Sequence, residues 1–154
     1  MCDITIDTQI LLFSDDPKAS SSIYAELLDA IESRPFIHLA VDDEGLIWKE
    51  YDDKIKATRF GRRLLGRLLA NRRIKRVPRI DVPRPAKAKF VELRFDKSDQ
   101  KFVRAAASTD SKRLVAEERH YAIRRVRSVI KDHFGVDVQD ARRAKEEICA
   151  NQPR

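Results

Sequence analysis

Short apolar segments with the composition of strands alternate along this chain with longer segments whose apolar residues recur at helical spacing. Strands are predicted at residues 4–7, 36–41, 113–116 and 136–138. Helices are predicted at 14–34, 47–55 and 60–71, from 99 onward, and at 118–133. Residues 78–85 hold three prolines and are predicted to form an extended loop or an edge segment. Strands that alternate with helices favour an α/β fold, with a mainly parallel sheet covered on both faces.

The length of 154 residues is enough for one domain with a hydrophobic core. We expect this domain to span residues 1–140, and residues 141–154 to form a charged tail that is a short helix or disordered. No apolar run approaches the roughly 20 residues that a membrane span needs. The two cysteines, Cys2 and Cys149, lie near opposite ends and match neither a disulfide framework nor zinc-ligand spacing. The sequence therefore predicts a cytoplasmic protein without a membrane contact.

The net charge of +7 is unevenly distributed along the chain. Residues 1–55 hold 4 Lys or Arg and 13 Asp or Glu, a net charge of −9, so residues 56–154 carry +16. The second part would attract a polymer of phosphates, and the first could supply a site for cations. We therefore expect a nucleic-acid partner. The alternative is a solvated basic surface with no polyanion partner.

Acidic residues recur where predicted strands end. Asp7 ends the first strand, Glu50 follows the second, Asp99 begins a helix, and a Glu117-Glu118 pair follows the strand around 114–115. In parallel sheets, ligands bind at the carboxyl ends of the strands. Separately, Asp7 could be a turn residue, Glu50 a solvated charge, and Asp99 a charge that favours its helix N-terminus. Together they favour a site for Mg²⁺ or Mn²⁺, which take oxygen ligands.

Four short motifs resemble, in order, those of the PIN-domain ribonucleases, and the resemblance covers about residues 3–140. The motifs lie at residues 4–9, 50–51, 98–106 and 114–121. The resemblance implies a PIN-like, three-layer α/β/α sandwich and metal-dependent cleavage of RNA. It also implies that the protein can be the toxin of a toxin–antitoxin pair, with an antitoxin as partner, and that it can form a homodimer.

The chain departs from the family pattern at three places. Gln9 stands where the family often has Asn, Ala116 stands where it has Thr or Ser, and the fourth acid is Glu rather than Asp. Both Glu117 and Glu118 could fill the fourth position, and alignment of residues 119–121 with the end of the motif favours Glu118. Loss of a hydroxyl at Ala116 removes a partner for the site, which bears on its efficiency but not on metal binding.

The leading hypothesis is a metal-dependent endoribonuclease that holds Mg²⁺ or Mn²⁺ with Asp7, Glu50, Asp99 and Glu118. Arginines would hold the RNA backbone; the candidates are Arg59, Arg63, Arg67, Arg119 and Arg124. A second hypothesis is a non-catalytic nucleic-acid-binding protein with a decayed site, which Gln9 and Ala116 would support. A third is a module whose arginine-rich face binds an acidic protein such as an antitoxin.

Overall fold

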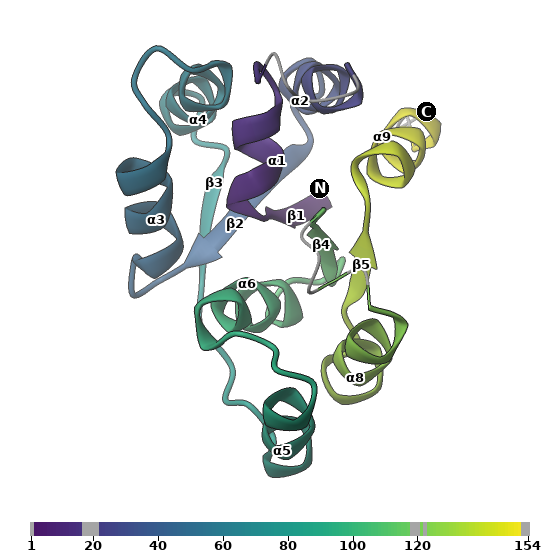
Figure 1. The fold of residues 1–154 in the computed structure, drawn as a ribbon. Coiled ribbons are helices and arrows are strands. Elements are labelled where there is room, and N and C mark those ends of the chain that lie inside the picture. The colour runs from purple at the N-terminus through teal and green to yellow at the C-terminus, as the bar shows by residue number, and fades with distance from the viewer. Residues whose placement is uncertain (1, 17–21, 118–120, 122, 152–154) are drawn as a thin grey trace.

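The computed structural model describes residues 2–16, 22–117, 121 and 123–151. It contains a five-stranded, all-parallel sheet with the strand order β3-β2-β1-β4-β5 (Figure 1). The strands are β1 (Cys2–Ile6), β2 (Ile37–Asp42), β3 (Ile74–Val77), β4 (Arg113–Val115) and β5 (Asp137–Gln139). The predicted α/β class with a parallel central sheet is confirmed, and the architecture is consistent with a PIN-like three-layer sandwich.

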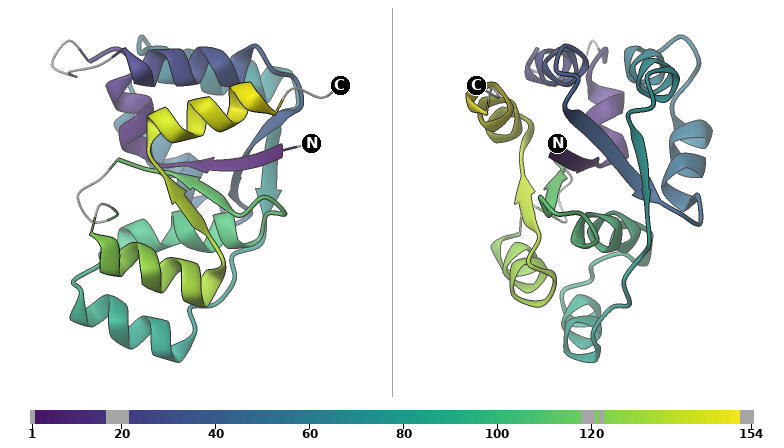
Figure 2. Two further views of the ribbon diagram at one scale, coloured as in Figure 1. Left: turned by 90° about the vertical axis from the view of Figure 1, so that its right-hand side faces the viewer. Right: turned by 180° about the vertical axis from the view of Figure 1, so that it is seen from behind.

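Helices cover both faces of this sheet (Figures 1 and 2). One face carries α1 (Thr8–Phe13), α2 (Ile23–Glu32), α4 (Phe60–Ala70) and α9 (Ala141–Ala150). The other carries α6 (Lys97–Ala107) and α8 (Arg124–Phe134), with α5 (Arg84–Glu92) packed outside against α8. The remaining helix, α3 (Leu46–Lys54), follows β2 and contacts β2, α1 and α6. None of the described helices is long and apolar enough to cross a membrane.

The order of the strands reverses next to β1. The chain builds β1, β2 and β3 outward in one direction, then returns to place β4 and β5 on the other side of β1. At this boundary the backbone N–H of Asp7 donates to the Val115 carbonyl at 2.9 Å. In open α/β sheets a ligand crevice forms outside the carboxyl ends of the strands at such a reversal. Asp7 therefore lies where this fold class places its binding site.

The core lies on both faces of the sheet and explains the apolar pattern of the helices. Ile4 and Ile6 of β1 and Leu39 and Val41 of β2 are buried. On α4 the leucines Leu64, Leu65 and Leu68 face the core, as their spacing predicts. The same spacing also predicts Leu69 on this side, but Leu69 is exposed, since it lies at the margin of the buried stripe.

Several element boundaries differ from those expected. The apolar run at 10–13 already belongs to α1, which begins directly after Asp7, and the next described helix begins at Ile23 instead of near residue 14. The cap of α6 is Asp96, whose carboxylate accepts from the Ser98 N–H at 2.8 Å, so the helix begins at Lys97, two residues before the predicted start at residue 99. Part of the helix predicted at 118–133 lies outside the described residues, and its described part begins at Arg124.

Two elements had no counterpart in the sequence-based prediction. One is the edge strand β3, in which two of the four residues are basic. The other is α5, which begins inside the segment predicted to be an extended loop, because Pro85 occupies its first turn, where proline is tolerated. The C-terminal segment forms α9, capped by Asp140, and packs against α2.

Candidate metal and nucleic-acid site

Asp7 is held rigidly at the carboxyl end of β1. Its side chain is buried, and its Oδ1 accepts from the Thr8 N–H at 2.8 Å, which caps α1. Capping of this kind explains why the strand stops here and a helix follows at once. Because the backbone of Asp7 is also bonded to β4, the carboxylate is fixed at the boundary where the strand order reverses.

Glu50 is positioned by the anchoring of α3 to the end of β2. Asp42, the last residue of β2, is buried and accepts from the N–H groups of Leu46 at 3.0 Å and Ile47 at 2.7 Å. Gly45 allows the connecting turn, because its φ of 82° is strained for other residues. The helix that results places Glu50 against α1, where the Thr8 hydroxyl donates to Glu50 Oε1 at 2.7 Å. A carboxylate from α3 thus lies beside the residue that follows Asp7.

The buried side chain of Tyr51 lies near the acidic residues at this end of the sheet, and they affect its pKa. Its ring is buried, and its hydroxyl donates to the Ile6 carbonyl. Burial raises the pKa of Tyr51 well above its ordinary value, because the phenolate would lose its solvation. Three carboxylates raise that pKa further: Asp7, Glu50 and Asp42. Three carboxylates, from the ends of β1 and β2 and from α3, therefore lie near the Tyr51 hydroxyl at this end of the sheet.

Asp99 lies in the first turn of α6 and is largely buried. Its backbone carbonyl accepts from the Tyr121 hydroxyl at 3.1 Å, which ties the start of α6 to the segment after β4. One turn on, the Phe102 ring packs against Tyr51 at a centroid distance of 6.4 Å. These contacts fix the helix that carries Asp99 against the helix that carries Glu50.

Two lysines neutralise Glu50. Lys101 of α6 donates from Nζ to Glu50 Oε2, and Lys54 donates to Oε1 at 3.1 Å. Burial alone would raise the pKa of Glu50. Hydrogen bonds from Lys101, Thr8 and Lys54 lower it more, so the pKa lies below its ordinary value. Glu50 is therefore ionised at neutral pH and already compensated by cations of the chain itself.

The donor chemistry suits a hard divalent cation, because Asp7, Glu50 and Asp99 offer only carboxylate oxygens. Within the described ranges, however, no three His, Cys, Asp or Glu side chains are grouped closely enough to hold a metal ion. Glu50 faces Lys101 in this arrangement. The residues thus fit a metal by type, but the described side chains are not grouped around one point, and the Glu50 carboxylate is bonded to Lys101 instead.

The fourth acidic motif is only partly described. Glu118, the predicted fourth ligand, lies outside the described residues, as does Arg119. Glu117 has a structural contact, because its Oε1 accepts from the Ala141 N–H at 2.9 Å, at the start of α9. Ala116 is buried at the end of β4.

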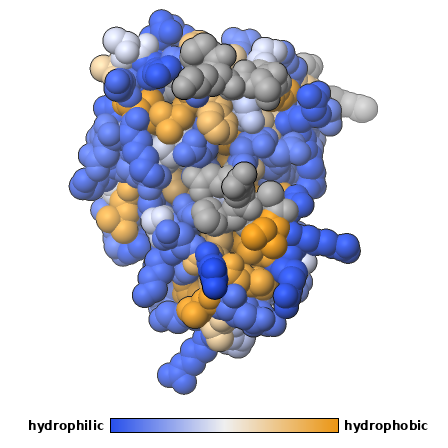
Figure 3. Space-filling view, in the orientation of Figure 1, coloured by the Kyte–Doolittle hydropathy of each residue, from blue (hydrophilic) through white to orange (hydrophobic). Residues whose placement is uncertain are grey.

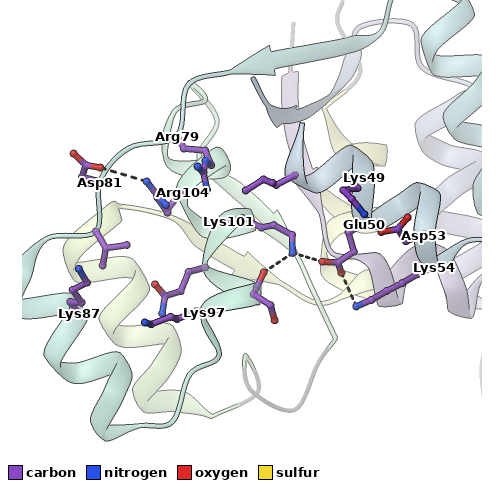
Figure 4. A pocket seen from close by; sticks show the side chains of 14 residues that line it. Lys49, Glu50, Asp53, Lys54, Arg79, Asp81, Lys87, Lys97, Lys101 and Arg104 are labelled. Atoms are coloured by element: carbon purple, nitrogen blue, oxygen red, sulfur yellow. Dashed lines mark hydrogen bonds and ion pairs between the residues drawn. The ribbon is translucent and has the colours of Figure 1, made fainter. Parts of the chain in front are cut away.

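A basic cavity of about 840 Å³ adjoins Glu50 (Figure 4). It lies between α3, the segment after β3, and α6, and Glu50 and Lys101 line it, whereas Asp7 and Asp99 do not. Its lining includes three acidic side chains, Glu50, Asp53 and Asp81, and seven basic ones, Lys49, Lys54, Arg79, Lys87, Lys97, Lys101 and Arg104. This lining was not singled out from the sequence, because its members come from four separate segments.

The arginines that the sequence proposed for RNA make local contacts. Arg59 pairs with Asp15 at 3.4 Å, and Arg67 pairs with Glu32. Arg63 lies over the Phe60 ring, 5.7 Å from its centroid. Arg124 lines a separate cavity of about 280 Å³ between α5 and α8.

No family model matches this chain, and no curated protein matches it.

Proposed function

We propose that this protein is a metal-dependent endoribonuclease whose acidic site lies at the carboxyl end of the parallel sheet. The observation that carries the proposal is the junction of α1 with α3, where Glu50 is bonded to the residue that follows Asp7. This junction lies at the reversal of strand order, where the fold class binds its ligands, and it adjoins a cavity rich in cations.

Asp7, Glu50 and Asp99 would hold the metal, with Glu118 as the proposed fourth ligand. When bound, Mg²⁺ or Mn²⁺ activates a water molecule and stabilises charge on the attacking and leaving oxygens of a phosphodiester. The protein's part is to hold the carboxylates in place. Tyr51 supports this role, because its neutral hydroxyl is buried beneath them and adds no charge.

The RNA backbone would be bound by the basic side chains of the cavity. Lys87 and Lys97 line it and form no ion pair with any described residue, so their ammonium groups are available to phosphates. Ammonium groups bind phosphate mainly through charge, which suits a backbone without regard to sequence. A polyanion held here would pass directly beside Glu50.

A second candidate is a non-catalytic nucleic-acid-binding protein of the same fold. The observation that favours it is the pairing of Glu50 with Lys101 and Lys54, and in addition no three acids are grouped among the described residues. Both candidates place the protein in the cytoplasm with RNA. Binding of an acidic antitoxin, or of a second copy of the chain, would be compatible with either.

Cleavage of single-stranded RNA in Mn²⁺ separates the two candidates. Wild-type protein should cleave, and Asp7→Asn should not, because the amide keeps the size of the carboxylate and removes the charge that a metal needs. RNA binding by the variant should equal or slightly exceed that of wild type, since a negative charge near the phosphates is gone. Asp52→Asn is the matched control: Asp52 lies on α3 near Glu50 but pairs with Arg62 at the surface, so cleavage should persist.

Absence of cleavage by the wild-type protein would favour the second candidate, the non-catalytic nucleic-acid-binding protein. If wild-type protein leaves varied RNAs intact in Mn²⁺ and Asp7→Asn is indistinguishable from it, the ribonuclease proposal is wrong. Loss of cleavage in Asp52→Asn as well would show that the assay responds to general changes in the protein rather than to the site.

A further inference from the structure

Lys101 is held in an unusual position for a lysine at the edge of a basic cavity. Its side chain is only 12% exposed. Its Nζ donates to Glu50 Oε2 and to the Ser98 carbonyl at 2.8 Å, and it lies 5.1 Å from the centroid of the Phe102 ring. Figure 4 shows the side chain reaching from α6 across to the Glu50 carboxylate on α3. Each of these contacts is one that an ammonium group favours.

We propose that Lys101 is an internal counter-ion that occupies the cation position on Glu50, so that a divalent metal must displace it before using that carboxylate. This inference rests on the proposed function, because it assumes that Glu50 is a metal ligand. It goes further by assigning a role to Lys101, a residue to which the sequence alone gives no function. Lys101 is a positioning residue under this proposal, and it acts through Glu50.

The hydrogen bonds of the carboxylate support this assignment. Oε1 of Glu50 accepts from Thr8 and Lys54, and Oε2 accepts from Lys101. Oε2 has two lone pairs, and one of them accepts from Lys101, so a metal ion bound through the other would lie next to the ammonium group. The ammonium also repels an approaching divalent cation, and this repulsion is strong because the pair is largely removed from water.

Lys54 contacts the same carboxylate but differs in its surroundings. Its side chain is 56% exposed, compared with 12% for Lys101. An exposed ion pair is screened by solvent and is readily exchanged. Lys54 can therefore leave Glu50 at little cost, whereas Lys101 is confined by α3 and α6. The two lysines thus form a natural pair for comparison.

The test is calorimetric titration of Mn²⁺ into wild-type protein and into three glutamine variants. Lys101→Gln should bind Mn²⁺ at least about tenfold more tightly than wild type, which corresponds to about 1.4 kcal/mol. Lys54→Gln tests whether removal of the exposed lysine partner of Glu50 changes the affinity for Mn²⁺. Lys97→Gln tests the general effect of removing one positive charge, because Lys97 lines the same cavity without an ion pair among the described residues. Both controls should change the affinity less than about threefold.

Thermal denaturation supplies a second measurement that does not depend on cleavage. Without metal, Lys101→Gln should melt below wild type, because Glu50 loses a partner. Mn²⁺ should then raise the melting temperature of Lys101→Gln more than that of wild type. Lys101→Arg, which keeps the charge, should bind Mn²⁺ as wild type does, and it serves if Lys101→Gln does not fold. A purely structural Lys101 would lower the melting temperature of the metal-free variant and leave the increase caused by Mn²⁺ unchanged.

Glu50→Gln distinguishes failure of this inference from failure of the proposed function. If Glu50→Gln binds Mn²⁺ as well as wild type does, or if no variant binds it, Glu50 is not a ligand and both proposals are overturned. If Glu50→Gln loses binding while Lys101→Gln binds no more tightly than Lys97→Gln, only the counter-ion is disproved.

Discussion

Two arginines of α4, Arg62 and Arg67, and two lysines of the cavity beside Glu50, Lys87 and Lys97, are all basic, but they differ in what their charges contact. On α4, Arg67 pairs with Glu32 and Arg62 pairs with Asp52, so their charges link neighbouring helices. In the cavity, Lys87 and Lys97 pair with no described residue. Hydrophilic residues cover most of the face seen in Figure 3, so a hydrophilic surface alone does not distinguish the two kinds of charge.

The periodicity of a helix therefore indicates which of its faces is polar. It does not indicate whether the charges on that face are free to bind a phosphate or are already paired within the fold. Arg63 and Arg67 recur opposite the buried leucines, as solvent-facing residues of an amphipathic helix should. The acidic residues that meet these arginines come from other elements, at a long distance in sequence. If this comparison holds, α4 mainly supports the fold, and the cavity mainly binds phosphates.

The largest effect expected from α4 is on stability, at Gly61. A Cβ at Gly61 would lie 2.6 Å from the Leu11 carbonyl oxygen of α1, a backbone atom that cannot turn aside. Gly61→Ala should therefore force α1 and α4 apart and lower the free energy of unfolding by about 1–3 kcal/mol. The measurement is chemical denaturation of purified protein. Because Asp7 caps α1, metal binding should weaken in the same variant.

Gly66 gives a matched control on the same helix. Apart from the adjacent backbone of α4 itself, no atom of the described residues lies within 4 Å of a Cβ built there. Gly66→Ala should raise stability by about 0.5–1 kcal/mol, because alanine loses less conformational entropy in a helix than glycine does. Both variants gain the same helix propensity, so their difference isolates the contact with Leu11. Equal stabilisation by both would show that α4 is not packed tightly against α1.

Much of the fold followed from local pattern, whereas the missed elements depend on tertiary context. The buried strands β1, β2 and β4 have apolar runs that predict them. The edge strand β3 has the sequence Ile-Lys-Arg-Val, which carries little strand signal, and its pairing with β2 defines it. Only Ile74 and Val77 are apolar, and of the four residues only Val77 is fully buried. Strand propensity is weakest at such edges, where packing decides the outcome.

A parallel sheet brings its strand ends together, which is why the sequence predicts that Asp7 and Glu50 lie near one another, and Glu50 is bonded to Thr8, the residue after Asp7. The lysine on Glu50 was not identifiable. Lys101 is 51 positions away from Glu50, and it follows Asp99 by two positions, a spacing that places two side chains on different faces of a helix. Contacts of this kind depend on how α3 and α6 pack, which no local pattern specifies.

A smaller effect is expected from the cavity, and it concerns RNA binding. The double variant Lys87→Gln and Lys97→Gln should weaken binding of single-stranded RNA roughly tenfold at low salt. Its plot of log affinity against log salt concentration should flatten by about 1.4, since each lost phosphate contact removes about 0.7 for a single strand. Fluorescence anisotropy across a salt series measures both quantities. Stability should stay near wild type, because the two side chains are exposed.

The comparison would fail if this double variant kept the affinity and the salt slope of wild type. The Arg63→Ala and Arg67→Ala double variant should then show the loss instead, and the RNA would be bound by α4. A loss shared equally by the two double variants would show that one RNA strand crosses both regions.

The smallest effect is expected for Arg67→Ala alone, and it tests whether the arginines of α4 act within the fold. Arg67 pairs with Glu32 at the end of α2, but its side chain is 59% exposed, so solvent screens the pair. Exposed ion pairs contribute about 0–1 kcal/mol, and we expect a loss of stability in this range. Glu32→Gln should cause a similar loss, and the double variant should lose no more than either single one, because both changes remove the same contact. RNA affinity should be unchanged in Glu32→Gln. If Glu32→Gln instead tightens RNA binding while Arg67→Ala weakens it, Arg67 exchanges Glu32 for phosphate, and the arginine row belongs to the binding surface after all.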